Sequence, residues 1–200
     1  MKLRFSTTLV AGLLCVGAAV SSTPALATVI EYRALLSGPA EATPNNSPGT
    51  GTAEVFFDDL AHSLRVVINY SGLLGRTTAA HIHCCTALPA TGAVGVATQL
   101  PSFGGFLLGV QAGSYDQTFD LTQAASYNPT FVTNNGGSVA TAEAALGAGL
   151  AARKAYVNIH TDAFPSGEIR GFLIPEPASL GLLGLGLAGL AASRRRRGSS

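Results

Sequence analysis

The sequence predicts a mainly β protein: an antiparallel β-sandwich of about seven or eight strands with one crossover helix. Apolar and polar residues alternate in several short segments, as in Leu64, Val66, Ile68 and Tyr70, and this pattern is typical of strands that bury one face. Stretches rich in Gly, Pro and Asn separate these segments, as loops and turns do. Many short strands with frequent turns favour two packed sheets.

Each element is placed by its own local pattern. Strands are expected at 29–36, 51–58, 62–70, 78–84, 92–99, 114–121, 155–161 and 167–174. One segment departs from alternation: after the turn-forming NNGG of 134–137, Ala142, Leu146 and Leu150 recur at helical spacing. This spacing predicts a crossover helix near 139–153 that packs on the sandwich.

The N-terminus has the pattern of an export signal. Lys2 and Arg4 precede an apolar run over 9–20, and the segment closes with small residues before Thr28. We expect residues 1–27 to be a helical signal peptide, removed by signal peptidase. The domain that remains is 28–174.

The C-terminal segment, 175–200, combines a short tripeptide, an apolar helix over 178–192 and an arginine cluster. The apolar helix would span about 22 Å, short of the roughly 30 Å hydrocarbon core, and the arginines would stay in the cytoplasm. This order resembles the PEP-CTERM sorting signal of Gram-negative bacteria. The residues that carry the resemblance are Pro175, Glu176, Pro177, Arg194, Arg195, Arg196 and Arg197.

That resemblance implies an exosortase as partner, transient anchoring in the inner membrane through 178–192, and delivery to the cell surface, outer envelope or extracellular matrix. A plain C-terminal membrane anchor is the alternative.

Charge adds a further constraint. The whole chain has a formal net charge of +1, but segment 28–174 has six Lys or Arg against ten Asp or Glu, a balance of −4. Such an acidic domain does not suit nucleic acid, whose binding requires cations that neutralise phosphates.

A pair of histidines predicts a metal site. Residues 79–85 read AAHIHCC, so in a strand His81 and His83 point to one face, about 7 Å apart, and Ile82 points to the core. In the strand YVNIHT, His160 lies on the face away from the core as well. Three imidazoles so placed suit copper or zinc. The alternative is that these histidines are half-exposed cross-strand partners that bond to loop carbonyls.

Neighbouring residues add candidates to this site. If 155–161 pairs with 167–174, His160 lies opposite Glu168 or Arg170, which brings a carboxylate to its far nitrogen. Asp162 is a further candidate oxygen ligand.

Two adjacent cysteines, Cys84 and Cys85, follow His83 directly. Consecutive Cα atoms lie about 3.8 Å apart across a trans peptide, below the window of relaxed disulfides, so a bond between them would be strained. Three arrangements stay open: a vicinal disulfide, an intermolecular link, or a metal ligand. For the last of these Cys85 is the candidate, because it shares the face of the histidines.

Three segments together resemble the CHRD domain: LLSGPAEATPNNSPGTGTAEVFFD, AAHIHCC and AYVNIHTDAFPSGEIRGFLI. The resemblance covers 29–174 and implies an extracellular β-sandwich module, with a matrix polysaccharide or a surface protein as partner.

Motifs of hydrolases, metalloproteases and nucleotide-binding enzymes are absent from the sequence. Four histidines are also too few for the two-metal site of copper-zinc superoxide dismutase.

Two hypotheses follow from these observations. The first is a non-enzymatic exported module of the cell surface or exopolysaccharide matrix. The second is an extracellular copper or zinc protein that uses His81, His83 and His160, with mononuclear metal redox activity as its enzymatic variant.

Overall fold

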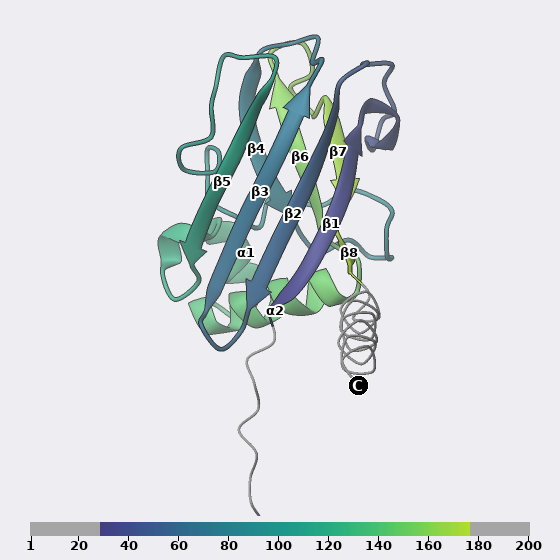
Figure 1. Cartoon of the computed structure of the whole chain (residues 1–200). Helices are drawn as coiled ribbons and strands as arrows, with labels where there is room; N and C mark the ends of the chain where they lie inside the picture. The colour runs from purple at the N-terminus through teal and green to yellow at the C-terminus, as the bar shows by residue number, and fades with distance from the viewer. Residues whose placement is uncertain (1–28, 177–200) are drawn as a thin grey trace, which may run out of the picture.

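The alternating segments form one antiparallel sheet that is curled into a half-barrel (Figure 1). The structure is a computed structural model that describes residues 29–176. Its strands are β1 (Ile30–Ser37), β2 (Thr50–Asp58), β3 (Ser63–Ser71), β4 (Thr77–His83), β5 (Gly113–Asp120), β6 (Tyr156–Thr161), β7 (Ile169–Phe172) and β8 (Ile174–Pro175). The described helices are α1 (Pro129–Asn134), α2 (Val139–Ala151) and the short 3-10 helices η1 (Gly38–Ala40) and η2 (Ala124–Ser126).

The strand order is β4-β6-β7-β1-β2-β3-β5, with β8 also paired to β1. A mainly β, antiparallel chain of seven or eight strands is therefore confirmed, but one continuous sheet stands where two packed sheets are expected. The two halves join at β1, which pairs with β2 along its length and with β7 and β8 on its other edge. Alternation indicates only that a strand has one buried face, and a curled sheet satisfies that pattern as a sandwich does.

Alternate residues of the strands fill the inside of the half-barrel. In β3, Leu64, Val66, Ile68 and Tyr70 are buried, whereas the residues between them are exposed or half-buried. Complete burial of one such side chain stabilises the fold by about 1.5–3 kcal/mol. The core therefore rests on the same period-two pattern that identifies the strands.

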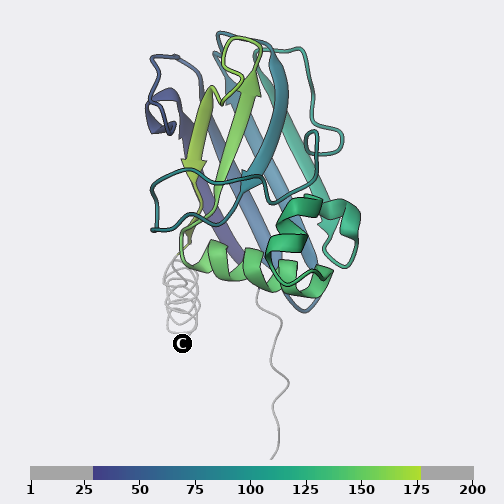
Figure 2. The same ribbon diagram turned by 180° about the vertical axis from the view of Figure 1, so that it is seen from behind.

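Helix α2 closes one end of the half-barrel, beside the turn between β2 and β3 (Figures 1 and 2). It begins after Ser138, whose side chain accepts from the backbone N–H of Thr141 while the Thr141 side chain bonds back to Ser138, a capping box. Leu146 and Leu150 are fully buried in the core. The helix expected near 139–153 is thus present and ends two residues earlier.

The long connection after β4 differs from the prediction. Residues 92–99 are expected to form a strand, but they make only isolated bridges, at Val96 and Thr98. They run along the free edge of β4, where the Ala97 N–H donates to the Ile82 carbonyl at 2.9 Å. Figure 2 shows this connection crossing the outer face of β6 and β7. The connection therefore buries the outer face of β6 and β7.

A buried carboxylate ties the turn between β6 and β7 to two loops. Glu168 is fully buried, and its oxygens accept from Ser47 Oγ at 2.6 Å, Thr161 Oγ1 at 2.7 Å, and the backbone N–H groups of Leu74 at 2.5 Å and Gly75 at 3.1 Å. Burial would raise the pKa of Glu168, but these donors together hold it below the ordinary value. The carboxylate is therefore ionised and structural.

No helix within residues 29–176 is long and apolar enough to cross a membrane. The expected signal helix at 1–27 and the apolar helix at 178–192 lie outside the described residues.

Truncation of the helix that closes the half-barrel should be costly. Replacement of Leu146 by alanine is expected to lower the free energy of unfolding by about 2–5 kcal/mol, because it leaves a cavity in the core. Urea denaturation measures the change. The matched control is Leu35→Ala, since Leu35 is 80% exposed and its truncation should change stability by less than about 0.5 kcal/mol. Equal losses in the two variants would contradict this account of the core.

Loss of the Glu168 charge should remove a pH-dependent part of the stability. The folded-state pKa lies below the ordinary 4.5, so this stability is complete above pH 4.5 and is lost as the pH falls through the folded pKa. We expect Glu168→Gln to lower the free energy of unfolding at pH 7 by roughly 1.5–3 kcal/mol. The variant should also lose less stability than the wild type on acidification, as measured by denaturation from pH 7 to pH 3. Glu54→Gln, on the outer face of β2, is the control that should behave like the wild type.

Candidate metal centre

Strand pairing brings three histidines together on the face of the sheet that points away from the core. His81 and His83 lie two residues apart in β4, and Ile82 between them is fully buried in the core. Strand β6 pairs with β4 so that His160 lies opposite Ala79. His160 therefore shares the face of the two β4 histidines.

The three imidazole rings surround one point. Ring centroids are 5.9 Å apart for His81 and His83, 5.3 Å for His81 and His160, and 5.8 Å for His83 and His160. One ring nitrogen from each residue lies within 4.8 Å of the corresponding nitrogens of the others. We call these three side chains the histidine cluster.

The other nitrogen of each ring is held by a backbone carbonyl. His81 Nε2 donates to the Pro101 oxygen at 2.8 Å, His83 Nδ1 to the Val94 oxygen at 2.8 Å, and His160 Nδ1 to the Pro165 oxygen at 2.9 Å. A carbonyl only accepts, so each of these nitrogens carries the ring proton. The lone pair of a neutral ring then lies on the opposite nitrogen.

These lone-pair nitrogens are buried and have no partner. They are His81 Nδ1, His83 Nε2 and His160 Nε2. His81 and His83 are 5% and 8% exposed, so the expectation of half-exposed histidines is wrong for both; the connection after β4 contacts them through the Pro101 and Val94 carbonyls. Burial lowers the pKa of His81 and of His83 to about 4 and lowers that of His160 as well. At neutral pH the cluster presents three neutral imidazoles.

The cluster matches the requirements of a transition-metal ion. Neutral imidazole nitrogen binds zinc and copper, and bonds to zinc are about 2.0–2.1 Å long. Two nitrogens bound at 2.1 Å to one tetrahedral ion lie about 3.4 Å apart, so binding would draw the widest pair of the cluster together by up to about 1.4 Å. Fixing the proton on the far nitrogen is also how proteins orient histidine ligands.

Aromatic and charged groups line one side of the cluster. The ring of Tyr156 stacks on His83 with centroids 4.7 Å apart, and the guanidinium of Arg170 lies 4.9 Å above the Tyr156 ring. Arg170 also donates to the carbonyls of Ala40 and Gly92. The structure therefore places Arg170 beside Tyr156 and opposite Asn158, so Arg170 is not the residue opposite His160, one of the two alternatives that the sequence leaves open.

Sequence reasoning missed a buried polar pair near this arginine. Glu41 and Asn158 are 6% and 3% exposed, and Glu41 Oε1 and Asn158 Oδ1 are both without a hydrogen-bond partner. Burial raises the pKa of Glu41 to about 7, although the charge of Arg170 acts in the opposite direction. Asn158 could have been found, because in β6 it alternates with core residues on the same face as His160.

Two acidic residues expected at the site are engaged elsewhere. The carboxylate of Glu168 accepts from four other donors, as described above, and its backbone N–H bonds to the Ile159 carbonyl just before β7 begins. The far nitrogen of His160 thus has a backbone oxygen as its partner instead of a carboxylate. Asp162 Oδ1 accepts from the Arg76 N–H at 2.7 Å, and Asp162 is outside the histidine cluster.

The two cysteines are joined to each other in a disulfide. Of the three arrangements that the sequence leaves open, the structure has the vicinal disulfide. The sulfur of Cys85 is therefore not a metal ligand in this form. Cys84 is buried and Cys85 is half-buried.

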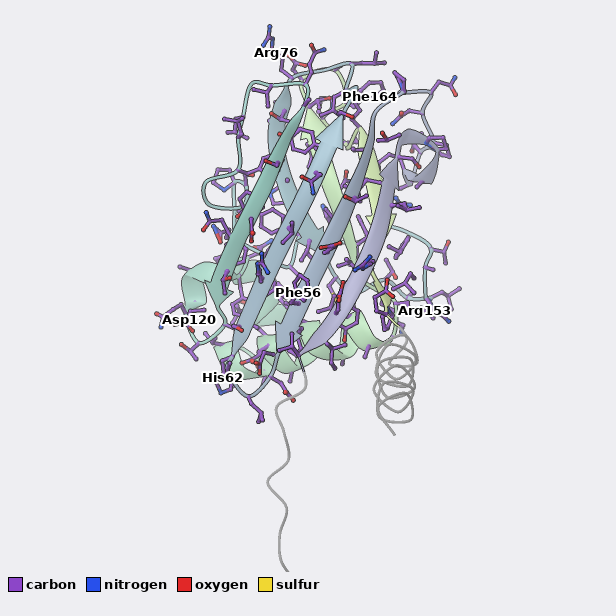
Figure 3. All side chains as sticks on the ribbon, viewed as in Figure 1. Phe56, His62, Arg76, Asp120, Arg153 and Phe164 are labelled. Carbon is purple, nitrogen blue, oxygen red and sulfur yellow. A yellow bond between two sulfur atoms is a disulfide. The ribbon has the colours of Figure 1, made fainter. Side chains whose placement is uncertain are left out.

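The fourth histidine, His62, lies in the turn between β2 and β3 (Figure 3) and is outside the histidine cluster. His62 Nδ1 pairs with the carboxylate of Glu143 on α2 at 2.9 Å, and this bond raises the pKa of His62. The pair of His62 and Glu143 links α2 to the turn between β2 and β3, and His62 is not part of the candidate centre.

Comparison with protein families agrees with this architecture. The model of the CHRD domain matches residues 32–173, and that of the PEP-CTERM protein-sorting motif matches residues 173–197. The sorting motif implies processing by an exosortase and export to the surface of a bacterium. No significant match was found among curated proteins or among solved structures. The domain match covers every strand from β2 to β7 together with the histidine cluster, and the chain belongs to the CHRD domain family.

Proposed function

We propose that this exported CHRD protein is a non-enzymatic surface or matrix module that binds one copper or zinc ion through His81, His83 and His160. The observation that carries the proposal is the convergence of three buried, unpartnered nitrogens whose rings are each fixed by a backbone carbonyl. Export is supported independently by the sorting motif.

A bound ion explains the cluster better than a buried water does. All three converging nitrogens are acceptors, because the proton of each ring is used on the opposite side. A water molecule has two hydrogens and can satisfy only two of them, which would leave one buried acceptor unpaired at a cost of about 1–3 kcal/mol. A cation accepts all three lone pairs at once.

The alternative is that these histidines are only cross-strand partners that bond to loop carbonyls, and the three bonds to carbonyls are indeed present. That interpretation accounts for one nitrogen of each ring and leaves the other three without a role. Isolated buried polar atoms are uncommon in folded proteins, so three at one point favour a ligand.

Copper and zinc are the ions that the ligand set supports. Three histidines without a carboxylate or thiolate suit borderline metals, since hard cations such as magnesium and calcium require oxygen ligands. With three protein ligands, a tetrahedral ion keeps one position for water or another small ligand.

Delivery follows from the two terminal segments, 1–27 and 175–200, most of which lies outside the described residues. We propose that signal peptidase cuts before Thr28 and that an exosortase acts at Pro175–Pro177 while residues 178–192 hold the chain at the inner membrane of a Gram-negative cell. The mature domain would then reside in the outer envelope or the exopolysaccharide matrix, in contact with polysaccharide or with other surface proteins.

Metal content tests the proposed site. The protein purified after export should contain one copper or zinc ion per chain, as measured by elemental analysis. His81→Ala and His160→Ala should each lower metal affinity sharply, because two imidazoles remain where three are needed. The control is His62→Ala, which removes a histidine that is paired with Glu143 and should keep full metal content.

Two results would contradict the proposal. One is metal-free wild-type protein that does not take up copper or zinc when either ion is added. The other is equal metal content in the His62 and His160 variants, which would indicate binding at unrelated surface sites.

The arginine cluster tests sorting. Replacement of Arg194–Arg197 by serine should leave an uncut precursor in the inner-membrane fraction, because the cytoplasmic charge that holds the segment is lost. Immunoblotting of cell fractions measures the ratio of precursor to mature protein. Serine at Arg33, Arg65, Arg76 and Arg153 removes the same charge from the folded domain and should leave processing unchanged. Normal cleavage of the first variant would argue against the assigned role of the cluster.

A further inference from the structure

We propose that the Cys84–Cys85 disulfide is a thiol-exchange site whose reduction weakens metal binding by the histidine cluster. The inference rests on the proposed function for its effect on metal, but the exchange itself concerns only the two sulfurs. The reductant would be a small thiol or a protein dithiol.

The disulfide opens onto a pocket at the end of β4. Both cysteines line this pocket, which has a volume of about 260 Å³, together with Val94, Val96 and the α1 residue Phe131. Cys84 is 4% exposed and Cys85 is half-buried. An attacking thiolate therefore reaches the sulfur of Cys85 more readily than that of Cys84.

Exchange at the Cys85 sulfur takes place in two steps. A reductant thiolate bonds to Cys85 Sγ, and the bond between the two sulfurs breaks as Cys84 leaves as a thiolate and takes up a proton. A second thiolate, from the other thiol of a dithiol or from a second molecule of a small thiol, then attacks the reductant's sulfur in the mixed disulfide, and Cys85 leaves as a thiolate and takes up a proton. The reductant is oxidised to a disulfide, and the protein gains two electrons and two protons.

One short segment connects the disulfide to the histidine cluster. Cys84 directly follows His83, and its backbone N–H donates to the Gly95 carbonyl at 3.3 Å. One residue earlier, the Val94 carbonyl accepts the His83 Nδ1 proton. On the other side, Val96 forms a bridge with His83. Segment 94–96 thus holds both the disulfide and the ring orientation of His83.

Helix α2 leaves the sulfurs little space on the opposite side. Gly149 packs against both sulfurs so closely that a Cβ at this position would overlap them. The Cys85 sulfur also lies 3.5 Å from the carbonyl oxygen of Ala145, one turn earlier in the helix. The sulfurs cannot move toward α2 unless the helix itself is displaced, and its leucines are buried in the core.

Reduction requires space that the α2 side of the disulfide does not provide. Two bonded sulfurs lie about 2.0 Å apart, whereas non-bonded heavy atoms settle at about 3.5–4.0 Å. Because α2 is fixed, the cysteines must move toward the pocket and segment 94–96. His83 would then lose the carbonyl that fixes its proton, and loss of such a partner lowers metal affinity by about 10- to 100-fold.

The experiment compares cobalt binding with the redox state of the cysteines in the protein purified after export. Cobalt(II) is the probe, because its visible absorption reports bound, low-coordinate ion. One sample stays oxidised, and another is treated with dithiothreitol and desalted without oxygen. Alkylation with iodoacetamide and mass spectrometry count the free thiols. We expect two alkylated cysteines and an affinity for cobalt about 10- to 100-fold weaker in the reduced sample.

The double variant Cys84→Ser/Cys85→Ser separates packing from thiol chemistry. It should bind cobalt as weakly as the reduced wild type, and dithiothreitol should not change its affinity. If the variant does not fold, the comparison of oxidised and reduced wild type still decides the question. A sulfur-to-cobalt absorption band in the reduced sample would instead indicate thiolate ligation and overturn the proposal.

Two other results would also overturn it: cysteines that stay unalkylated after dithiol treatment of the folded protein, or equal cobalt affinity in both redox states. Failure of the proposed function gives a different result, since no cobalt would then bind in either state. In that case the coupling falls with the metal site, while the thiol count still decides whether exchange occurs.

Discussion

The antiparallel register between β4 and β6 is the constraint on which the candidate centre depends. It places His160 opposite Ala79 and thereby beside His81 and His83, and a slip by one residue would move His160 to the core side of the sheet. Core residues on the opposite face, such as Ile82 and Ile159, fix this register through their burial. The apolar core thus positions a polar site that it does not touch.

Much of this arrangement is readable in the sequence, because alternation assigns faces. The face shared by the three histidines follows from alternation in β4 and β6. The inward face shared by Ile159 and Ile169, which pair in the structure, follows in the same way from β6 and β7. Alternation could not distinguish a sandwich from a curled sheet, since the number of sheets depends on contacts such as that between Ser37 and Arg170. It could not identify the carbonyl partners either. The oxygens of Val94, Pro101 and Pro165 belong to loops without a period, and any residue could have supplied them.

Glu168 shows a second limit of sequence reasoning. Strand pairing correctly brings it near β6, but the side chain is directed by donors from residues far apart in the chain, among them Ser47 and Leu74. A fully buried carboxylate with four donors is a structural element, and the histidines are oriented by backbone instead. The carboxylate charge that stabilises the loops is thus kept apart from the candidate centre, whose three imidazoles are neutral.

The histidines of β4 and β6 stand on opposite sides of the long connection that contains β5, α1 and α2. All three imidazoles meet only after that whole connection has folded, so a chain exported in extended form would cross the membrane without the complete site. On the proposed function, such a chain would take up its ion only on the far side. Which ion fills the centre would then depend on the composition of the surroundings of the cell, and the cytoplasmic metal pools would have no part in the choice.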